Sequence, residues 1–168
     1  MEIETPVKEP EMTLKKDRPD AGTASELKGY KEKILPVNKG SLTLERDLYF
    51  TGTTQRGYEV EYDPNYVEGC SPTETLLLSV AGCLAIDVVT ILRKMRCTLS
   101  SFHVDVEGVR KLTPPQYYTA ITLAIHVSGS DITPQKMERA IALSRDTYCS
   151  VYHSLRKDLT LDVRYEIK

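Results

Sequence analysis

Two cysteines in this sequence occupy positions where a thiol could act as a nucleophile. Cys83 lies within a long apolar stretch, and Asp87 follows it one helical turn later. Cys149 lies near the start of a late predicted helix, where the positive end of the helix dipole would lower the pKa of a thiol. Either cysteine could instead be a small buried packing residue, which is the commoner role of a cysteine inside a helix. Cys149 and His153 also have the spacing of two metal ligands on one helix face, but no second Cys/His pair accompanies them.

The apolar stretch around Cys83 predicts a helix from Ser71 to Arg96. Ser71 and Glu74 form a capping-box pattern at its start. The stretch is apolar around its whole circumference, which is typical of a helix buried on all sides. Its uncharged part is too short to span a bilayer, and Asp87 interrupts the rest. Gly82 costs about 1 kcal/mol in a helix relative to alanine, so we expect it to serve packing or access beside the thiol.

Alternating apolar residues predict strands on both sides of this helix. Strands are expected around residues 42–50, 58–62, 102–107, 117–127 and 161–167, and further helices over 131–144 and 148–157, with a break or kink at 145–147. Neighbouring strands would pair with one another, which predicts an α+β fold with an antiparallel sheet. A sheet this small covers one side of the central helix, so we expect a second subunit to cover another side.

The composition argues against several classes of protein. Lys and Arg number 22 against 24 Asp and Glu, a net charge of −2, so no basic excess points to nucleic acid or to a membrane surface. Residues 1–36 are polar and charged, and we expect a mobile tail without a signal peptide, followed by one domain over 37–168. The four cysteines form no CxxC pair, which favours reduced thiols in a cytoplasmic protein.

Three short segments together resemble the OsmC/Ohr family of osmotically inducible and organic-hydroperoxide-resistance proteins. They are Ser71-Pro72-Thr73-Glu74, Ala81-Gly82-Cys83 and Tyr148-Cys149-Ser150. The sequence from Ala81 through Val89 looks most like the YhfA-like branch of that family. The resemblance covers residues 42–168. It implies an α+β fold in which antiparallel sheets surround long central helices in an intertwined homodimer.

The resemblance also implies a chemistry for the two cysteines. Family members that act as peroxidases reduce organic hydroperoxides, which would make Cys83 the attacking thiol and Cys149 the resolving thiol. In this chemistry a thiolate attacks the peroxide, and a nearby thiol traps the resulting sulfenic acid before it is irreversibly oxidised. An external dithiol would then regenerate the pair, and no bound cofactor or metal is expected.

The family also uses a glutamate and an arginine beside the reactive thiol. Glu74 is the candidate glutamate, although it stands one position later than in the peroxidases and half a helical turn away from the direction of Cys83. Its other role would be the helix cap with Ser71. Arg46 is the first candidate arginine and Arg56 the second, and each could equally be a solvated surface residue.

Three functional hypotheses follow from these residues. The first is a thiol-dependent peroxidase that prefers organic hydroperoxides, because apolar neighbours of Cys83 would favour an alkyl group. The second is a protein of the same fold that binds a small apolar or electrophilic ligand near Cys83 without peroxidase activity. The third is a structural dimer with inert thiols. Cys70 and Cys97 remain open as competitors of Cys149 for the resolving role.

Overall fold

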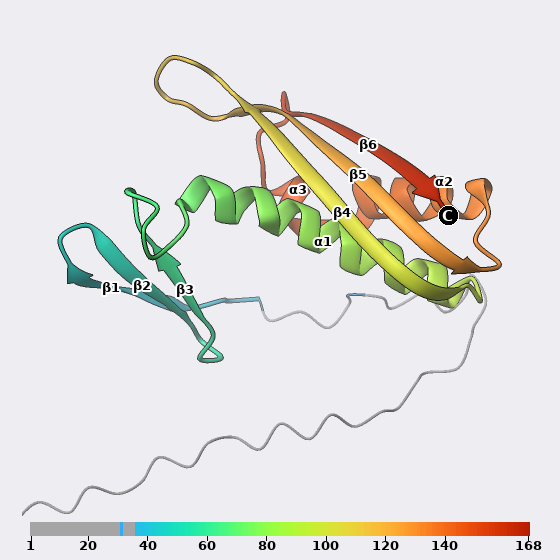
Figure 1. The fold of residues 1–168 in the computed structure, drawn as a ribbon, viewed down its shortest axis with the longest axis horizontal. Coiled ribbons are helices and arrows are strands. Elements are labelled where there is room, and N and C mark those ends of the chain that lie inside the picture. Colours follow the sequence, from blue (N-terminus) through green and yellow to red (C-terminus); the bar gives the residue numbers. More distant parts are fainter. Residues whose placement is uncertain (1–30, 32–35) are drawn as a thin grey trace, which may run out of the picture.

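The structure is a computed structural model that describes Lys31 and residues 36–168. The predicted tail over residues 1–36 lies outside the described residues apart from Lys31 and Pro36, so the division into tail and domain stays a prediction. The described chain consists of a small sheet, a long central helix and a larger sheet with further helices (Figure 1). This is the α+β organisation that the sequence predicts.

The small sheet stands beyond the N-terminal end of the central helix (Figure 1). It contains β1 (Gly40–Arg46), β2 (Tyr49–Thr54) and β3 (Glu59–Tyr62), paired antiparallel in that order. The sequence predicts a strand over 42–50 with a charged break at residues 45–47. The break is a turn between two strands, because Asp47 adopts a positive φ of 46° there. A bridge between Tyr62 and Cys70 joins the end of β3 to the loop that leads into the helix.

The central helix α1 (Pro72–Lys94) begins with the predicted capping box. The Ser71 side chain accepts a hydrogen bond from the Glu74 backbone N–H, and the Glu74 carboxylate accepts one from the Ser71 backbone N–H at 2.7 Å. Arg93 and Lys94 lie in the last turn, where cations complement the helix dipole. The cap and the dipole therefore fix both ends of the helix where the sequence predicted them.

One stripe of α1 is buried, and another is open in the single chain. The buried stripe consists of Val80, Ala81, Leu84, Asp87, Val88, Ile91 and Leu92. On another side, Leu78 and Ile86 are 60% and 64% exposed. The predicted burial on all sides is therefore not met within one chain. By length and composition alone α1 would also be long enough to cross a membrane, although it packs here against a sheet.

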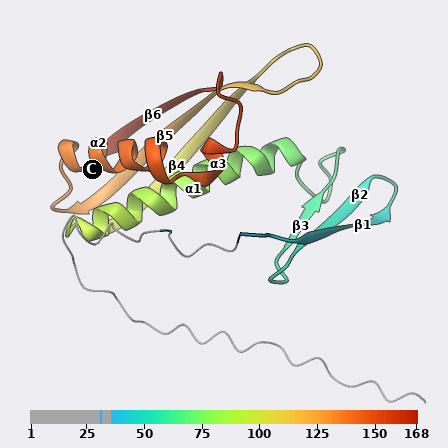
Figure 2. The ribbon, with the colours of Figure 1, turned by 180° about the vertical axis from the view of Figure 1, so that it is seen from behind.

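The larger sheet contains β4 (Thr98–Arg110), β5 (Tyr118–Ser130) and β6 (Thr160–Ile167). β4 and β5 form an antiparallel hairpin, as predicted, and β6 pairs with β5 in parallel. Alternate residues of β5 are fully buried, namely Ile121, Leu123, Ile125 and Val127. The helices lie together on one face of this sheet (Figure 2), so the main core lies between β5 and α1.

The last helical segment passes over α1 before the chain returns to β6. α2 (Pro134–Leu143) is capped by Thr133 and continues directly into a π-helical turn, Ser144–Tyr148. After Cys149 comes the short α3 (Ser150–His153). The break predicted at 145–147 corresponds to this π-helical turn, and the predicted helix over 148–157 is shorter than expected. The turn lies against α1, as does α3.

Candidate functional site

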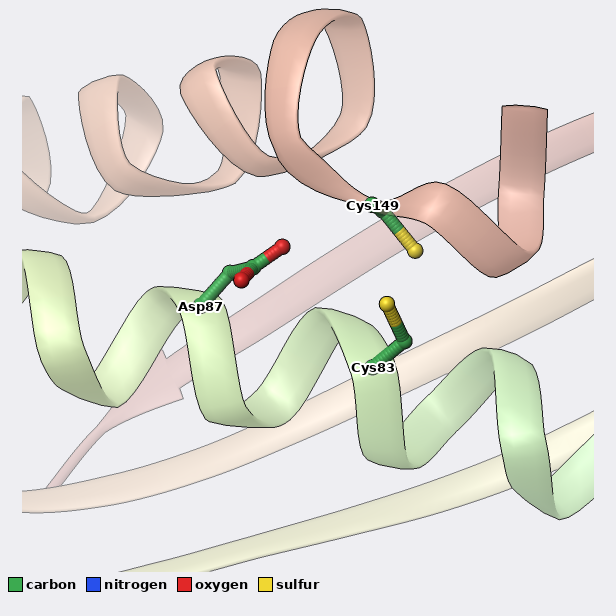
Figure 3. Close-up of side chains that lie close together, drawn as sticks. All are labelled: Cys83, Asp87 and Cys149. Atoms are coloured by element: carbon green, nitrogen blue, oxygen red, sulfur yellow. The ribbon is translucent and has the colours of Figure 1, made fainter. Parts of the chain in front are cut away.

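Cys83 and Cys149 face one another across the contact between α1 and the segment after the π-helical turn (Figure 3). The sulfur atoms of both cysteines and a carboxylate oxygen of Asp87 all lie within 4.8 Å of one another. Cys149 is fully buried, whereas Cys83 is half-buried. Two residues that are 66 positions apart in the sequence are thus brought together, with solvent access on the Cys83 side.

Asp87 reaches the same cluster because of helix geometry. Residues four positions apart on an α-helix lie on the same face, so Cys83 and Asp87 point toward the same neighbouring segment. Asp87 is fully buried, and its Oδ2 atom accepts a hydrogen bond of 3.0 Å from the Ser144 hydroxyl. The π-helical turn thus supplies one partner for the carboxylate.

Lys31 supplies a second partner for Asp87. The Lys31 Nζ atom lies 2.7 Å from Asp87 Oδ1, donates to the Tyr148 carbonyl oxygen at 3.0 Å and lies 3.9 Å from Cys83 Sγ. A buried carboxylate is stable in a protein only when it is paired and hydrogen-bonded. The sequence gives no sign of the contact with Lys31, since nothing distinguishes this lysine within a polar segment.

Burial controls the acidity of Cys149. Removal of the thiol from water raises its pKa to about 12, and the neighbouring Cys83 and Asp87 act in the same direction. The prediction that a helix N-terminus would lower the pKa of Cys149 is therefore wrong. α3 has only four residues, and the backbone hydrogen bond from Tyr152 lowers the pKa by less than burial raises it.

Glu74 and Arg46 lie away from the thiols within the single chain. Glu74 belongs to the capping box and is nine residues from Cys83 on a continuous helix, which corresponds to about 13 Å along the axis. Arg46 forms an exposed ion pair with Glu68 at the edge of the small sheet. Arg56 is exposed in the turn between β2 and β3. The catalytic roles suggested for Glu74 and Arg46 stay predictions.

The other thiols and His153 have separate surroundings. Cys70 contacts the Thr75 hydroxyl at 3.1 Å before the first turn of α1. Cys97 lies beyond the other end of the helix and donates to the Asp131 carbonyl oxygen at 3.2 Å, and burial raises its pKa. His153 is exposed beside the ring of Tyr152, with the ring centroids 5.8 Å apart. Cys149 is therefore the one cysteine that lies beside Cys83 in the described residues.

The fold and the site define an α+β protein with a thiol pair between its central helix and a late helical turn. A family model described as OsmC-like protein matches residues 64–164. Protein YhfA of Escherichia coli strain K12 is 35% identical over 121 residues, covering 71% of this chain and 90% of YhfA. The chain therefore belongs to the OsmC-like protein family, as the resemblance in the sequence predicts.

Solved structures agree with this assignment. A hypothetical protein from Aquifex aeolicus VF5 is 27% identical with a TM-score of 0.72, and the match covers 80% of this chain and 98% of that one. An organic hydroperoxide resistance protein from Legionella pneumophila is 14% identical with a TM-score of 0.58, covering 80% and 99% of the two chains. At that identity the likeness establishes the shared fold.

Proposed function

We propose that this protein is a thiol-dependent peroxidase that reduces organic hydroperoxides through Cys83 and Cys149. The observation that carries the proposal is the proximity of a half-buried thiol to a fully buried one, within 4.8 Å. The Legionella pneumophila protein that shares this fold is named an organic hydroperoxide resistance protein, which supports organic hydroperoxides as the substrate class. A reactive thiol needs access to its substrate, and a resolving thiol needs protection from that substrate, which matches the burial of the two cysteines.

The bonds that form and break in this reaction involve the two thiols, the hydroperoxide and an external dithiol. The Cys83 thiolate attacks the outer oxygen of the hydroperoxide, the O–O bond breaks, and the alkoxide takes up a proton and leaves as an alcohol. Cys83 is then a sulfenic acid. The Cys149 sulfur attacks the Cys83 sulfur, a disulfide forms, and the sulfenic oxygen leaves as water. A dithiol substrate then reduces this disulfide and becomes a disulfide itself.

The cation for this chemistry would come from Lys31 within the single chain. Its ammonium group lies 3.9 Å from Cys83 Sγ and would attract the negative charge that develops on that sulfur. Asp87 holds the ammonium group in place through an ion pair of 2.7 Å. In this proposal Lys31 supplies the positive charge that the sequence suggested for an arginine. Arg46, at the end of β1, is paired with Glu68 of the loop before α1.

The protein would act as a homodimer in the cytoplasm, without nucleic acid or membrane as a partner. Leu78, Gly82 and Ile86 recur at intervals of one helical turn and form an exposed stripe on α1. A stripe of exposed large apolar side chains is typical of a protein interface. Ile86 is also one turn from Cys83, so an apolar surface beside the thiol would favour an alkyl hydroperoxide over hydrogen peroxide.

A second candidate is a protein that binds a small apolar or electrophilic ligand near Cys83 without peroxidase activity. The observation that favours it is the position of Glu74, whose carboxylate accepts hydrogen bonds from the backbone N–H and the hydroxyl of Ser71. A carboxylate used as a helix cap leaves the thiol without the glutamate that the peroxidases place beside it.

Product analysis after oxidation distinguishes the two candidates. The reduced protein would be treated with an equimolar amount of cumene hydroperoxide, quenched by alkylation and mapped by non-reducing peptide mass spectrometry. The peroxidase predicts a rapid Cys83–Cys149 disulfide, its loss in Cys83→Ser, and a sulfenic adduct of Cys83 in Cys149→Ser. Cys97→Ser is the matched control and should behave as wild type. Alkylation of both thiols after minutes of exposure, with no disulfide, would refute the peroxidase.

A further inference from the structure

The cluster at the thiol pair contains the ligand atoms of a metal site. Two sulfur atoms and a carboxylate oxygen, from Cys83, Cys149 and Asp87, lie within 4.8 Å of one another. In a tetrahedral zinc site the sulfur ligands are about 2.3 Å from the metal and therefore about 3.8 Å apart. The three groups thus need only small side-chain movements to reach the spacing of metal ligands.

The surroundings of these atoms already accommodate a cation. The Lys31 ammonium group contacts Asp87 Oδ1 at 2.7 Å, the Tyr148 carbonyl oxygen at 3.0 Å and Cys83 Sγ at 3.9 Å. A positive charge is therefore stabilised at the position where a metal ion would approach Asp87 and Cys83. This observation is independent of the spacing of the ligand atoms.

The carboxylate is also held as a ligand would be. The Ser144 hydroxyl donates to Asp87 Oδ2 at 3.0 Å and leaves Oδ1 directed toward the cation. Carboxylate ligands of metals are commonly fixed by such an outer hydrogen bond. The half-buried Cys83 provides a route from solvent to the site.

We propose that the reduced protein binds one Zn²⁺ ion through Cys83 Sγ, Cys149 Sγ and Asp87 Oδ1, in competition with the Lys31 ammonium group. On binding, each thiol loses a proton to solvent and its sulfur bonds to the metal, while the ammonium group leaves Oδ1. Thiolates select zinc over magnesium and calcium, which prefer oxygen ligands. Three protein ligands leave a fourth position for water.

Zinc affinity of the full-length, reduced protein tests this directly. Competition with a chromophoric chelator would measure affinity and stoichiometry, and Co²⁺ would report thiolate ligation through its charge-transfer absorption. We expect one zinc ion per chain, and a loss of affinity in Cys83→Ser and Cys149→Ser of more than about 100-fold, beyond the effect of losing an outer hydrogen bond. The matched control Cys97→Ser should retain wild-type affinity, because Cys97 lies beyond the far end of α1.

Two further variants remove a contact of the Asp87 carboxylate and keep both thiols. Ser144→Ala removes the outer hydrogen bond and should weaken zinc binding about 10- to 100-fold. Lys31→Met removes the competing charge and should tighten zinc binding about tenfold or more. It should also gain more in Tm from added Zn²⁺ than wild type does, because the metal then compensates the buried carboxylate.

The variants distinguish zinc held by the thiol pair from zinc bound elsewhere on the chain. Equal loss of zinc in Cys83→Ser and Cys97→Ser would overturn the proposal, as would zinc binding that persists in the Cys83→Ser/Cys149→Ser double variant. Weaker binding in Lys31→Met would also overturn it, because Lys31 would then support the metal instead of competing with it. None of these measurements involves a peroxide, so their failure leaves the proposed peroxidase untouched, and an inactive peroxidase leaves the zinc site standing.

Discussion

Replacing Lys31 with methionine removes the ammonium group from Asp87 and retains most of the apolar stem. At 2.7 Å and an effective dielectric constant of about 20, the attraction between the two charges is about 6 kcal/mol. The Lys31 side chain is 29% exposed, so solvent screens part of this attraction, and ordering the side chain costs about 2 kcal/mol. We therefore expect Lys31→Met to lower the free energy of unfolding by about 3 kcal/mol, as for other buried pairs that lose one partner.

Urea unfolding followed by far-UV circular dichroism would measure this loss, with reduced, metal-free protein at one fixed concentration. Lys39→Met is the matched control, because Lys39 is an exposed lysine shortly before β1. The double variant Lys31→Met/Asp87→Asn should recover part of the stability, since no buried charge is then left alone. A loss in Lys31→Met below about 0.5 kcal/mol, the usual scale of surface substitutions, would refute the ion pair as a stabilising contact.

Three further predictions concern Cys149, Gly82 and Glu74. The pKa of Cys149 is raised from 9.0 to about 12, so between these pH values the thiol releases its proton when the protein unfolds. As the pH rises through this range, wild type should therefore lose up to about 1.4 kcal/mol more unfolding free energy per pH unit than Cys149→Ala does. Equal slopes in urea titrations at increasing pH would contradict the buried neutral thiol. A Cβ at Gly82 meets nothing within 4 Å in the single chain, so Gly82→Ala should stabilise a monomer by about 1 kcal/mol. If sedimentation experiments instead show that the substitution weakens a dimer, a second copy of the chain packs on the exposed face of α1 that contains Gly82. Glu74→Gln should reduce Tm slightly through the helix cap and leave the rate of cumene hydroperoxide consumption unchanged, and a large loss of that rate would assign Glu74 to catalysis.

The long elements could be predicted because local chemistry specifies them. The capping box of Ser71 and Glu74 sets the start of α1 without help from the rest of the chain. The alternation of apolar residues in β4 and β5 places their buried faces for the same local reason. The approach of Cys149 to Cys83 came from the family resemblance, because no local pattern links residues so far apart in the sequence.

The parts that the sequence missed depend on tertiary contacts. A lysine in a polar segment looks solvated, and only the folded chain shows that Lys31 meets a buried carboxylate. The pKa of Cys149 follows burial, which overrides the short helix that the sequence used to predict the opposite direction. The face of α1 around Leu78 and Ile86 is apolar in the sequence and exposed in the chain, and we expect its cover to come from a second molecule.

The π-helical turn Ser144–Tyr148 connects the state of the thiols to the beginning of the described chain. It carries the hydroxyl that holds Asp87 and the carbonyl that receives Lys31, and Cys149 follows directly after it. A displacement of Cys149, whether toward a disulfide or toward a metal, would therefore shift both anchors of Lys31 at once. A chemical event at the sulfur atoms would in this way change the position of Lys31, the first residue that the structure describes.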